Sequence, residues 1–304
     1  MLRGNYTARM DSKGRLKVPT AFRRYLEEKY GQQFYVTSLD GECVRIFPLP
    51  EWESIEQRLA LLPSMDPARR KFLDRTNYYG QQATMDGQAE GLPVPTFLWR
   101  ERGVVPFVKV DKGLEAEDDG VALMKPIPGL DELLARAASL GVFGTKERSV
   151  IRLPSRNGIA AVVAQQFELA ERVAAHGLVP IVEPEVLIKS PDKAGAETIL
   201  LEELTEALDA LPEGRRVMLK LTIPDVPGFY SPLVDHPRVV RVVALSGGHT
   251  RAEACERLAR NRGVIASFSR ALTDDLRRSM SDAEFDAALE RSITEIYQAS
   301  AVKA

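Results

Sequence analysis

Cysteine and histidine are both scarce in this chain of 304 residues. The two cysteines, Cys43 and Cys255, lie far apart in the sequence, which excludes a disulfide framework and favours a reducing compartment. The three histidines, His176, His236 and His249, lack the spacing of metal ligands, so we expect no metal and no metal cofactor. No apolar run approaches the roughly 20 residues that span a bilayer, and the N-terminus lacks the apolar core of a signal peptide. We therefore expect a soluble cytoplasmic protein without a membrane partner.

Neither positive nor negative charge predominates over the whole chain, but its two ends differ in net charge. The net charge is −2, with 44% apolar and 28% charged residues, which is typical of a globular protein. Residues 1–80 hold 14 Lys and Arg against 10 Asp and Glu, whereas residues 81–304 hold 27 against 33. A basic front end therefore precedes an acidic body, and any nucleic-acid binding is expected at the front alone.

The first 80 residues have the pattern of a small α+β segment. Thr20 is a suitable cap for a helix over 21–30. Residues 33–48 alternate around the pair Asp40-Gly41, which predicts a β-hairpin. A charged helix is expected over about 51–61.

From residue 103 onward, short apolar runs alternate with amphipathic stretches. We expect strands over 104–110, 149–153 or slightly earlier, 178–182, 217–221, 239–245 and 264–268. We expect helices over 131–140, 160–176, 194–211, 251–261 and 282–300. This order predicts an α/β fold with a parallel sheet, and the lack of a Gly-x-Gly-x-x-Gly turn favours a (β/α)8 TIM-barrel type over a dinucleotide fold. Only six of the eight strands of such a barrel are present.

The expected strand ends carry an unusual number of polar residues, and active sites of parallel α/β folds lie at those ends. In strand order, the residues at these ends are Lys109, Asp111 and Lys112, then Lys146 and Arg148, then Glu183 and Glu185, then Lys220, then Ser246-Gly247-Gly248, and finally Ser269-Arg270.

Lys220 lies within an otherwise apolar strand, and this placement suggests nucleophilic chemistry. Burial disfavours the ammonium form of a lysine, and a neighbouring cation such as Lys146 acts in the same direction. The free amine can attack a carbonyl carbon to form an imine, for which Glu183 is a suitable proton acceptor. The alternative is a buried Lys–Glu pair with a purely structural role.

The run Ser246-Gly247-Gly248 precedes an expected helix and resembles the phosphate site found after the last strands of many barrels. Arg270 follows the next strand and could contribute to the same site. The alternative is an ordinary glycine turn.

The body resembles the bacterial class I fructose-1,6-bisphosphate aldolases over about 84–304. The matching runs are GVVPFVKVDKG (103–113), FGTKER (143–148), LVPIVEPEV (178–186), VMLKLTIP (217–224), LSGG (245–248) and ASFSRAL (266–272). The resemblance implies a sugar-phosphate substrate and reversible Schiff-base cleavage to dihydroxyacetone phosphate and glyceraldehyde 3-phosphate, without a metal. It implies an imine on Lys220, a proton acceptor in Glu183 and supporting charges in Lys146, Glu185 and Lys109. The phosphates would be held by Ser246, Gly247, Gly248, Arg270 and Arg148.

The front resembles the MraZ regulators, which have an AbrB-type swapped-hairpin fold, over about 1–83. The matching runs are LRGNY (2–6), MDSKGRLKVP (10–19), PLPEWE (48–53) and RRKFL (69–73). By this resemblance, DNA would be bound by Arg3, Lys13, Arg15 and Lys17, and the alternative is a solvated basic hairpin.

Both resemblances cover only part of their families' patterns. The second MraZ hairpin begins at Met85-Asp86-Gly87, but no Arg follows the glycine in 89–95. The aldolase pattern lacks its first two strands, and with the first of them the family's active-site Asp. We therefore predict a fusion of two domains, 1–83 and 84–304, that acts as an aldolase. The alternatives are a DNA-binding regulator and an inactive chimera, and self-association is expected because both families tend to assemble.

Overall fold

The computed structural model describes residues 16, 18, 20–38, 43–63, 66–78, 80–84, 88–89, 92–277 and 279–303. The four residues predicted to bind DNA, Arg3, Lys13, Arg15 and Lys17, lie outside this part of the chain. The chain divides into two compact units, Met1–Gln88 and Ala89–Ala304, which are described separately below. The short strands β4 (Gln88–Ala89) and β5 (Leu92–Pro93) lie where the division falls.

In the part of the first unit that the structure describes, there are a three-stranded antiparallel sheet of order β2-β1-β3 and three helices. The predicted hairpin is confirmed, because β1 (Gln33–Ser38) pairs antiparallel with β2 (Val44–Pro48). The remaining elements are β3 (Gln81–Thr84), α1 (Thr20–Tyr30), α2 (Leu49–Ala60) and α3 (Pro67–Tyr78). The helices expected over 21–30 and 51–61 are thus α1 and α2.

Trp52 forms the centre of the small core of this unit. Its side chain is 1% exposed and stacks on Tyr35 at 4.4 Å between ring centroids, with Phe72 at 6.2 Å. The hydroxyl of Thr37 donates a hydrogen bond of 2.7 Å to the carbonyl of Thr76, which joins β1 to α3. An aromatic cluster of this kind supplies most of the apolar burial of so small a unit.

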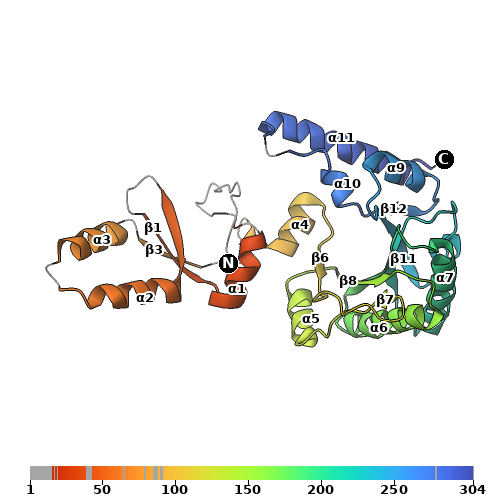
Figure 1. Cartoon of the computed structure of the whole chain (residues 1–304), viewed down its shortest axis with the longest axis horizontal. Coiled ribbons are helices and arrows are strands. Elements are labelled where there is room, and N and C mark those ends of the chain that lie inside the picture. The colour runs from red at the N-terminus through yellow and green to blue at the C-terminus, as the bar shows by residue number, and fades with distance from the viewer. Residues whose placement is uncertain are drawn as a thin grey trace. The chain divides into compact units, whose positions relative to one another are not determined.

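The second unit contains the predicted parallel sheet, with strand order β12-β11-β10-β9-β8-β6 (Figure 1). Its strands are β6 (Phe107–Lys109), β8 (Gly144–Ile151), β9 (Val179–Val186), β10 (Val217–Thr222), β11 (Val239–Leu245) and β12 (Val264–Ala266). A seventh strand, β7 (Val121–Ala122), pairs antiparallel with the end of β8. Among the described strands, β6 and β12 are the two ends of the parallel series, so the series forms an open arc.

The second predicted strand begins earlier than the apolar pattern indicates. It starts at Gly144 rather than Ser149, and it includes the charged run from Lys146 to Arg148. Such a run lacks the apolar signature of a buried strand, but Lys146 and Arg148 share one face while Glu147 lies on the other. A strand with charges on both faces is hard to detect from hydropathy.

The helices surround this sheet, and the five long ones match the predicted helices to within a few residues. They are α5 (Leu130–Ser139), α6 (Arg156–Ala175), α7 (Lys193–Ala210), α9 (Arg251–Ala259) and α11 (Asp282–Ala301). The short helices α4 (Val94–Arg102), α8 (Ser231–Val234) and α10 (Arg270–Thr273) were not predicted. Side chains of Ser155, Asp192, Thr250 and Ser281 cap the N-termini of α6, α7, α9 and α11.

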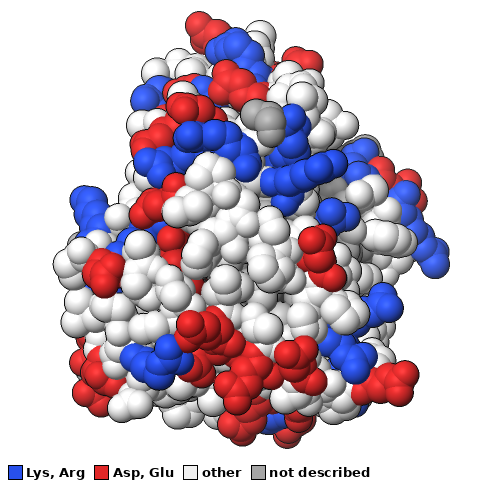
Figure 2. Space-filling model, turned by 90° about the vertical axis from the view of Figure 1, so that its right-hand side faces the viewer, with Lys and Arg blue, Asp and Glu red and all other residues white. Residues whose placement is uncertain are grey.

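The core of this unit lies between the sheet and its helices. Val182 on β9 and Leu219 on β10 are fully buried against residues such as Val162 of α6 and Leu204 of α7. On the side of the molecule where α7 lies, uncharged side chains fill the middle of the face and acidic ones gather along its lower edge (Figure 2).

The C-terminal segment covers the outer edge of β12. The amide of Ala266 donates to the hydroxyl of Ser300 at 3.0 Å, and the ammonium of Lys303 donates to the carbonyl of Val264 at 2.6 Å. An edge whose backbone groups are bonded in this way no longer offers them to another chain.

Candidate active site

The polar residues of four neighbouring strands lie on one face of the parallel sheet. Arg148 of β8 is in register with Glu183 of β9, and Lys109 of β6 is in register with Lys146 of β8. Because alternate residues of a strand share a face, Lys146 and Arg148 lie together there, as do Glu183 and Glu185. Lys220 of β10 joins them through its ion pair with Glu183.

Lys109, Lys146, Glu183 and Lys220 form a group that we call the lysine array. Glu183 lies between two of its lysines, at the centre of the group. Its Oε2 is 2.7 Å from Nζ of Lys146, and its Oε1 is 3.1 Å from Nζ of Lys220. The carboxylate is 3% exposed, and the two ammonium groups compensate for the cost of burying its charge. One carboxylate therefore holds the amine groups of Lys146 and Lys220 close together.

A second ion pair joins Arg148 to Glu185, with Nε 2.5 Å from Oε2. Burial acts to lower the pKa of Arg148, but the hydrogen bond and negative charge of Glu185 raise it. Both side chains project from the same face as Glu183, and Glu185 is buried. The pair therefore places a fixed guanidinium beside the lysine array.

Asp111 belongs to the array, although the sequence assigned it no role. Its carboxylate is buried and forms an ion pair with Lys109, and its Oδ2 is 3.8 Å from Nζ of Lys146. The available sequence signal was its position two residues after β6 in a parallel fold, where functional side chains gather.

Glu147 lies on the opposite face of β8 and is fully buried. Its Oε2 accepts a hydrogen bond of 3.1 Å from the hydroxyl of Thr145. Burial raises the pKa of Glu147 to about 8, against the smaller opposing effects of Thr145 and Lys146. This carboxyl group is therefore mostly protonated at neutral pH, unlike an acid that serves as an ion-pair partner.

The predicted phosphate loop follows β11 directly. Gly247 and Gly248 have φ of +64° and +112°, a region that glycine adopts without strain. A Cβ at Gly247 would lie 2.6 Å from Cγ2 of Ile188, so the loop also packs too closely for a side chain. Ser246 is buried beside these glycines. Arg270 is exposed and begins α10, four residues after the neighbouring strand β12.

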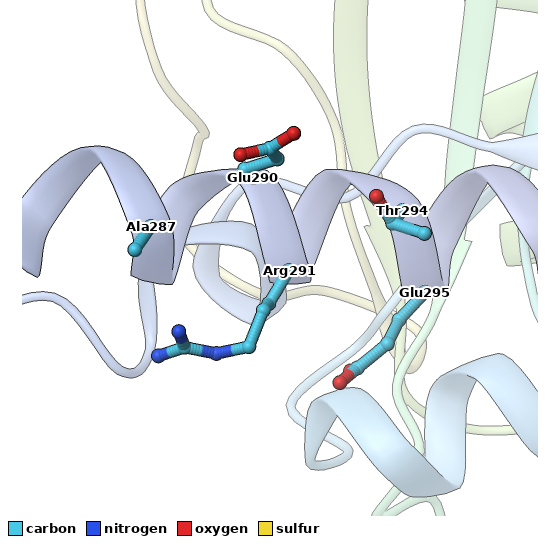
Figure 3. A pocket seen from close by; sticks show the side chains of 5 residues that line it. All are labelled: Ala287, Glu290, Arg291, Thr294 and Glu295. Carbon is cyan, nitrogen blue, oxygen red and sulfur yellow. The ribbon is translucent and has the colours of Figure 1, made fainter.

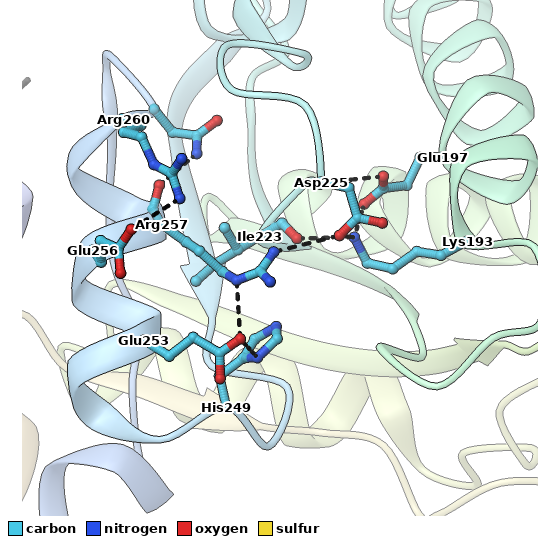
Figure 4. A network of polar contacts seen from close by, with 10 residues as sticks. Lys193, Glu197, Ile223, Asp225, His249, Glu253, Glu256, Arg257 and Arg260 are labelled. Carbon is cyan, nitrogen blue, oxygen red and sulfur yellow. Dashed lines mark hydrogen bonds and ion pairs between the residues drawn. The ribbon is translucent and has the colours of Figure 1, made fainter.

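A separate network of charged side chains begins at the buried start of α7 and leads outward to α9 (Figure 4). The ammonium of Lys193 is 2.7 Å from Glu197 and 3.0 Å from Asp225, and Arg257 reaches the same Asp225 at 3.5 Å. Burial raises the pKa of Glu197 more than Lys193 lowers it. Because these charges are paired with one another, the network joins α7 to α9 and to the segment after β10.

A surface hollow of about 420 Å³ lies along α11 and is lined by Ala287, Glu290, Arg291, Thr294 and Glu295 (Figure 3). Glu295 also pairs with Arg251 of α9 at 2.6 Å. All the lining residues come from one helix, and none belongs to the lysine array.

Within the described part of the chain, no helix has the length and apolar character needed to cross a membrane. The same residues include no group of three His, Cys, Asp or Glu side chains arranged to hold a metal ion.

The fold and the charged face place the second unit in the class of α/β barrel enzymes. A solved fructose-bisphosphate aldolase from Plasmodium falciparum, determined as a ternary complex with TRAP and a small-molecule inhibitor, shares this fold. It aligns with a TM-score of 0.59 and 23% identity, over 70% of this chain and 73% of its own.

Comparisons of sequence identify the family of this chain more specifically than the shared fold does. The family model for fructose-bisphosphate aldolase class-I matches residues 81–222. A fructose-bisphosphate aldolase class 1 from Synechocystis sp. is 54% identical over 217 residues, which is 71% of this chain and 72% of the relative. A relative of the same name from Porphyromonas gingivalis is 54% identical over 219 residues, 72% of this chain and 74% of its own length. The chain belongs to the class I fructose-bisphosphate aldolase family.

The front of the chain matches a different family. Residues 1–75 match the model for MraZ protein. Both resemblances seen in the sequence are thus confirmed, and they concern successive parts of one chain.

Proposed function

We propose that this chain catalyses the reversible cleavage of fructose 1,6-bisphosphate through an imine on Lys220. The observation that carries the proposal is the ion-paired array in which Glu183 lies between Lys220 and Lys146, in a chain of the class I aldolase family. The same proposal divides the chain into an MraZ-like segment, 1–83, and an aldolase segment, 84–304.

The first step is attack of the Lys220 amine on the ketone carbon of the substrate. A proton must leave Lys220 beforehand, and Glu183, 3.1 Å away, is the nearest acceptor. Glu183 then returns its proton to the hydroxyl group of the carbinolamine, which leaves as water and gives a protonated imine, a cation. The bond that breaks joins the carbon next to the imine to the carbon that bears the departing hydroxyl group. Its electron pair forms the double bond of an enamine, while the positive nitrogen takes up the π electrons of the imine.

Cleavage also requires removal of the proton from the hydroxyl group on the departing fragment. Glu183 is suited to accept it, because its carboxylate lies on the same face as Lys220 and within ion-pair distance of the amine that carries the imine. Glyceraldehyde 3-phosphate leaves first. The remaining enamine takes up a proton on carbon, and water hydrolyses the imine to release dihydroxyacetone phosphate and the amine of Lys220.

The phosphates of the substrate need positive charge and backbone donors. The loop of Ser246, Gly247 and Gly248, followed by the N-terminus of α9, supplies amide groups for one phosphate, and Arg270 supplies charge. Arg148 is suited to the second phosphate, provided that it shares its guanidinium with Glu185.

Trapping the imine tests this proposal. Borohydride added with dihydroxyacetone phosphate reduces an imine to a stable secondary amine, and we expect the adduct on Lys220 by peptide mass spectrometry. Lys220→Arg should abolish it, whereas Lys125→Arg, a change on another segment, should leave it intact. A folded wild-type protein that gains no adduct at Lys220 would refute the proposal.

A second proposed activity, DNA binding by the front segment, is supported by its match to the MraZ family and by its net charge of +4 over residues 1–80. We expect binding to repeated promoter boxes that weakens steeply with salt and with Arg15→Ala. Equal affinity for unrelated DNA would contradict a regulator.

A further inference from the structure

We propose that Asp111 is the positioning residue of the lysine array, holding the ammonium of Lys146 in place to bind Glu183. The inference rests on the proposed aldolase function for its catalytic consequence, but the electrostatic relation between Asp111 and Lys146 can be measured without a substrate.

The register of the sheet creates the need for such a residue. Lys109 of β6 lies directly opposite Lys146 of β8, and two like charges in opposite positions on adjacent strands destabilise a sheet. The amide of Val110 donates to the carbonyl of Lys146 at 3.1 Å, so the two backbones cannot separate to relieve the repulsion. An anion close to both ammonium groups removes this conflict.

Asp111 provides that anion. Its Oδ1 binds the ammonium of Lys109, and its Oδ2 lies 3.8 Å from the ammonium of Lys146. The carboxylate is 7% exposed, and Oδ2 has no hydrogen bond among the described residues. The backbone amide of Gly113 points at Oδ1 from 3.4 Å. The free oxygen therefore faces Lys146, whose other partner is Glu183.

The balance of charge on this face depends on Asp111. Among the described residues, the groups joined by ion pairs on this face are Lys109 on β6, Lys146 and Arg148 on β8, Glu183 and Glu185 on β9, Lys220 on β10, and Asp111 after β6. Four cations thus meet three carboxylates, and Glu185 is already paired with Arg148. Without Asp111, Glu183 would be the sole carboxylate for three lysines, and its capacity to accept a proton would fall.

The test measures how readily each lysine is acylated at a fixed pH, because only the free amine reacts with acetic anhydride. Asp111→Asn removes the anion and should raise acylation of Lys146, because its ammonium then loses a carboxylate oxygen 3.8 Å away and is held less firmly on Glu183. Lys125 serves as the internal reference. Asp118→Asn is the matched control, because it makes the same change at an exposed carboxylate and should leave Lys146 unaltered.

Lys109→Met is a second variant in case Asp111→Asn does not fold, and it should change the acylation of Lys146 in the opposite direction. The side chain of Lys109 is 56% exposed, so its loss leaves the core intact, and Asp111 is then free to bind Lys146 alone. We expect acylation of Lys146 to decrease. Unchanged acylation of Lys146 in either folded variant would overturn the proposal.

The catalytic consequence is a separate measurement. Asp111→Asn should lower kcat by about tenfold or more with little change in KM, because Asp111 acts through Lys146 rather than on the substrate. Asp111→Glu, which keeps the anion, should recover part of the loss. If the wild-type protein forms no imine, the aldolase proposal fails, while the acylation result still decides the role of Asp111.

Discussion

At the scale of single residues, two glutamates one position of sheet register apart illustrate how environment sets the role of a carboxyl group. Glu183 is buried but lies between the ammonium groups of Lys146 and Lys220. Glu147 is buried on the opposite face of β8, where a hydroxyl group is its hydrogen-bond partner. A buried carboxylate with paired cations retains its charge, whereas one without them takes up a proton.

Glu147→Gln should stabilise the protein at neutral and alkaline pH. The pKa of Glu147 is raised to about 8 in the folded state by burial, from the ordinary 4.5. The folded state therefore binds a proton that the unfolded chain releases, and this residue's contribution to stability declines as pH rises from about 4.5 to about 8. The glutamine variant is always neutral and does not show that decline. Its free energy of unfolding should therefore exceed that of the wild-type protein by about 2–4 kcal/mol at pH 7.5.

Urea unfolding at pH 5, 6, 7 and 8 measures this difference. The difference in unfolding free energy between Glu147→Gln and the wild-type protein should increase with pH. Glu168→Gln, on an exposed position of α6, is the control and should show no such trend. A constant difference across the pH range would contradict the protonated state of Glu147.

At the scale of elements, the loop between β11 and α9 combines backbone conformation with close packing. Gly247 has φ of +64°, and a Cβ there would meet Cγ2 of Ile188 at 2.6 Å. Gly177, between α6 and β9, has φ of +74° and no atom within 4 Å of the same position. The two glycines therefore separate the cost of the backbone conformation from the cost of the contact.

Gly247→Ala should destabilise the protein more than Gly177→Ala does. Both substitutions force a left-handed conformation on alanine, at about 1 kcal/mol. Gly247→Ala must also displace Ile188, which adds roughly 1–3 kcal/mol and moves the phosphate loop. We expect a higher KM for fructose 1,6-bisphosphate in this variant alone, and equal losses of stability in the two variants would contradict the packing argument.

At the scale of the whole molecule, the chain combines two units with separate cores. The first is built around Trp52, Tyr35 and Phe72, and the second around the parallel sheet and its helices. The family matches change close to this division, with MraZ over residues 1–75 and class I aldolase over 81–222, so the last residues of the first unit already belong to the aldolase match. Changes confined to one core should therefore affect one unit.

Trp52→Ala should destabilise the first unit by about 3–5 kcal/mol, the usual cost of removing a large buried aromatic side chain. We expect calorimetry to show one thermal transition shifted downward and a second one unchanged, with imine formation on Lys220 retained. A single transition that shifts as a whole would show that the two cores unfold together.

Much of the fold was predictable because its signals are local. The long helices and most parallel strands follow apolar periodicity, and the hairpin of β1 and β2 follows alternation around a turn. The start of β8 was not predictable in this way. Its residues Lys146, Glu147 and Arg148 are charged, and only pairing with strands on both sides makes the segment a strand.

The candidate site, too, was only partly predictable from the sequence. The sequence singled out Lys220, Glu183, Lys146 and Arg148 by residue type and by resemblance, because their polarity is conspicuous in apolar strands. It gave no reason to choose Asp111 over Lys112, its neighbour. The buried carboxylate near both Lys109 and Lys146 is recognised only once the register of β6 and β8 is known.

The sequence by itself determined the scarcity of cysteine and histidine, the basic front and acidic body, the two families and the order of the main elements. These properties depend on composition and on short-range patterns. The tertiary structure alone decided which charges are paired, which carboxyl group is protonated and which glycine cannot accept a side chain. Those outcomes depend on distances between residues far apart in the chain, and a few ångströms determine whether two charges stabilise each other or one of them is lost to a proton.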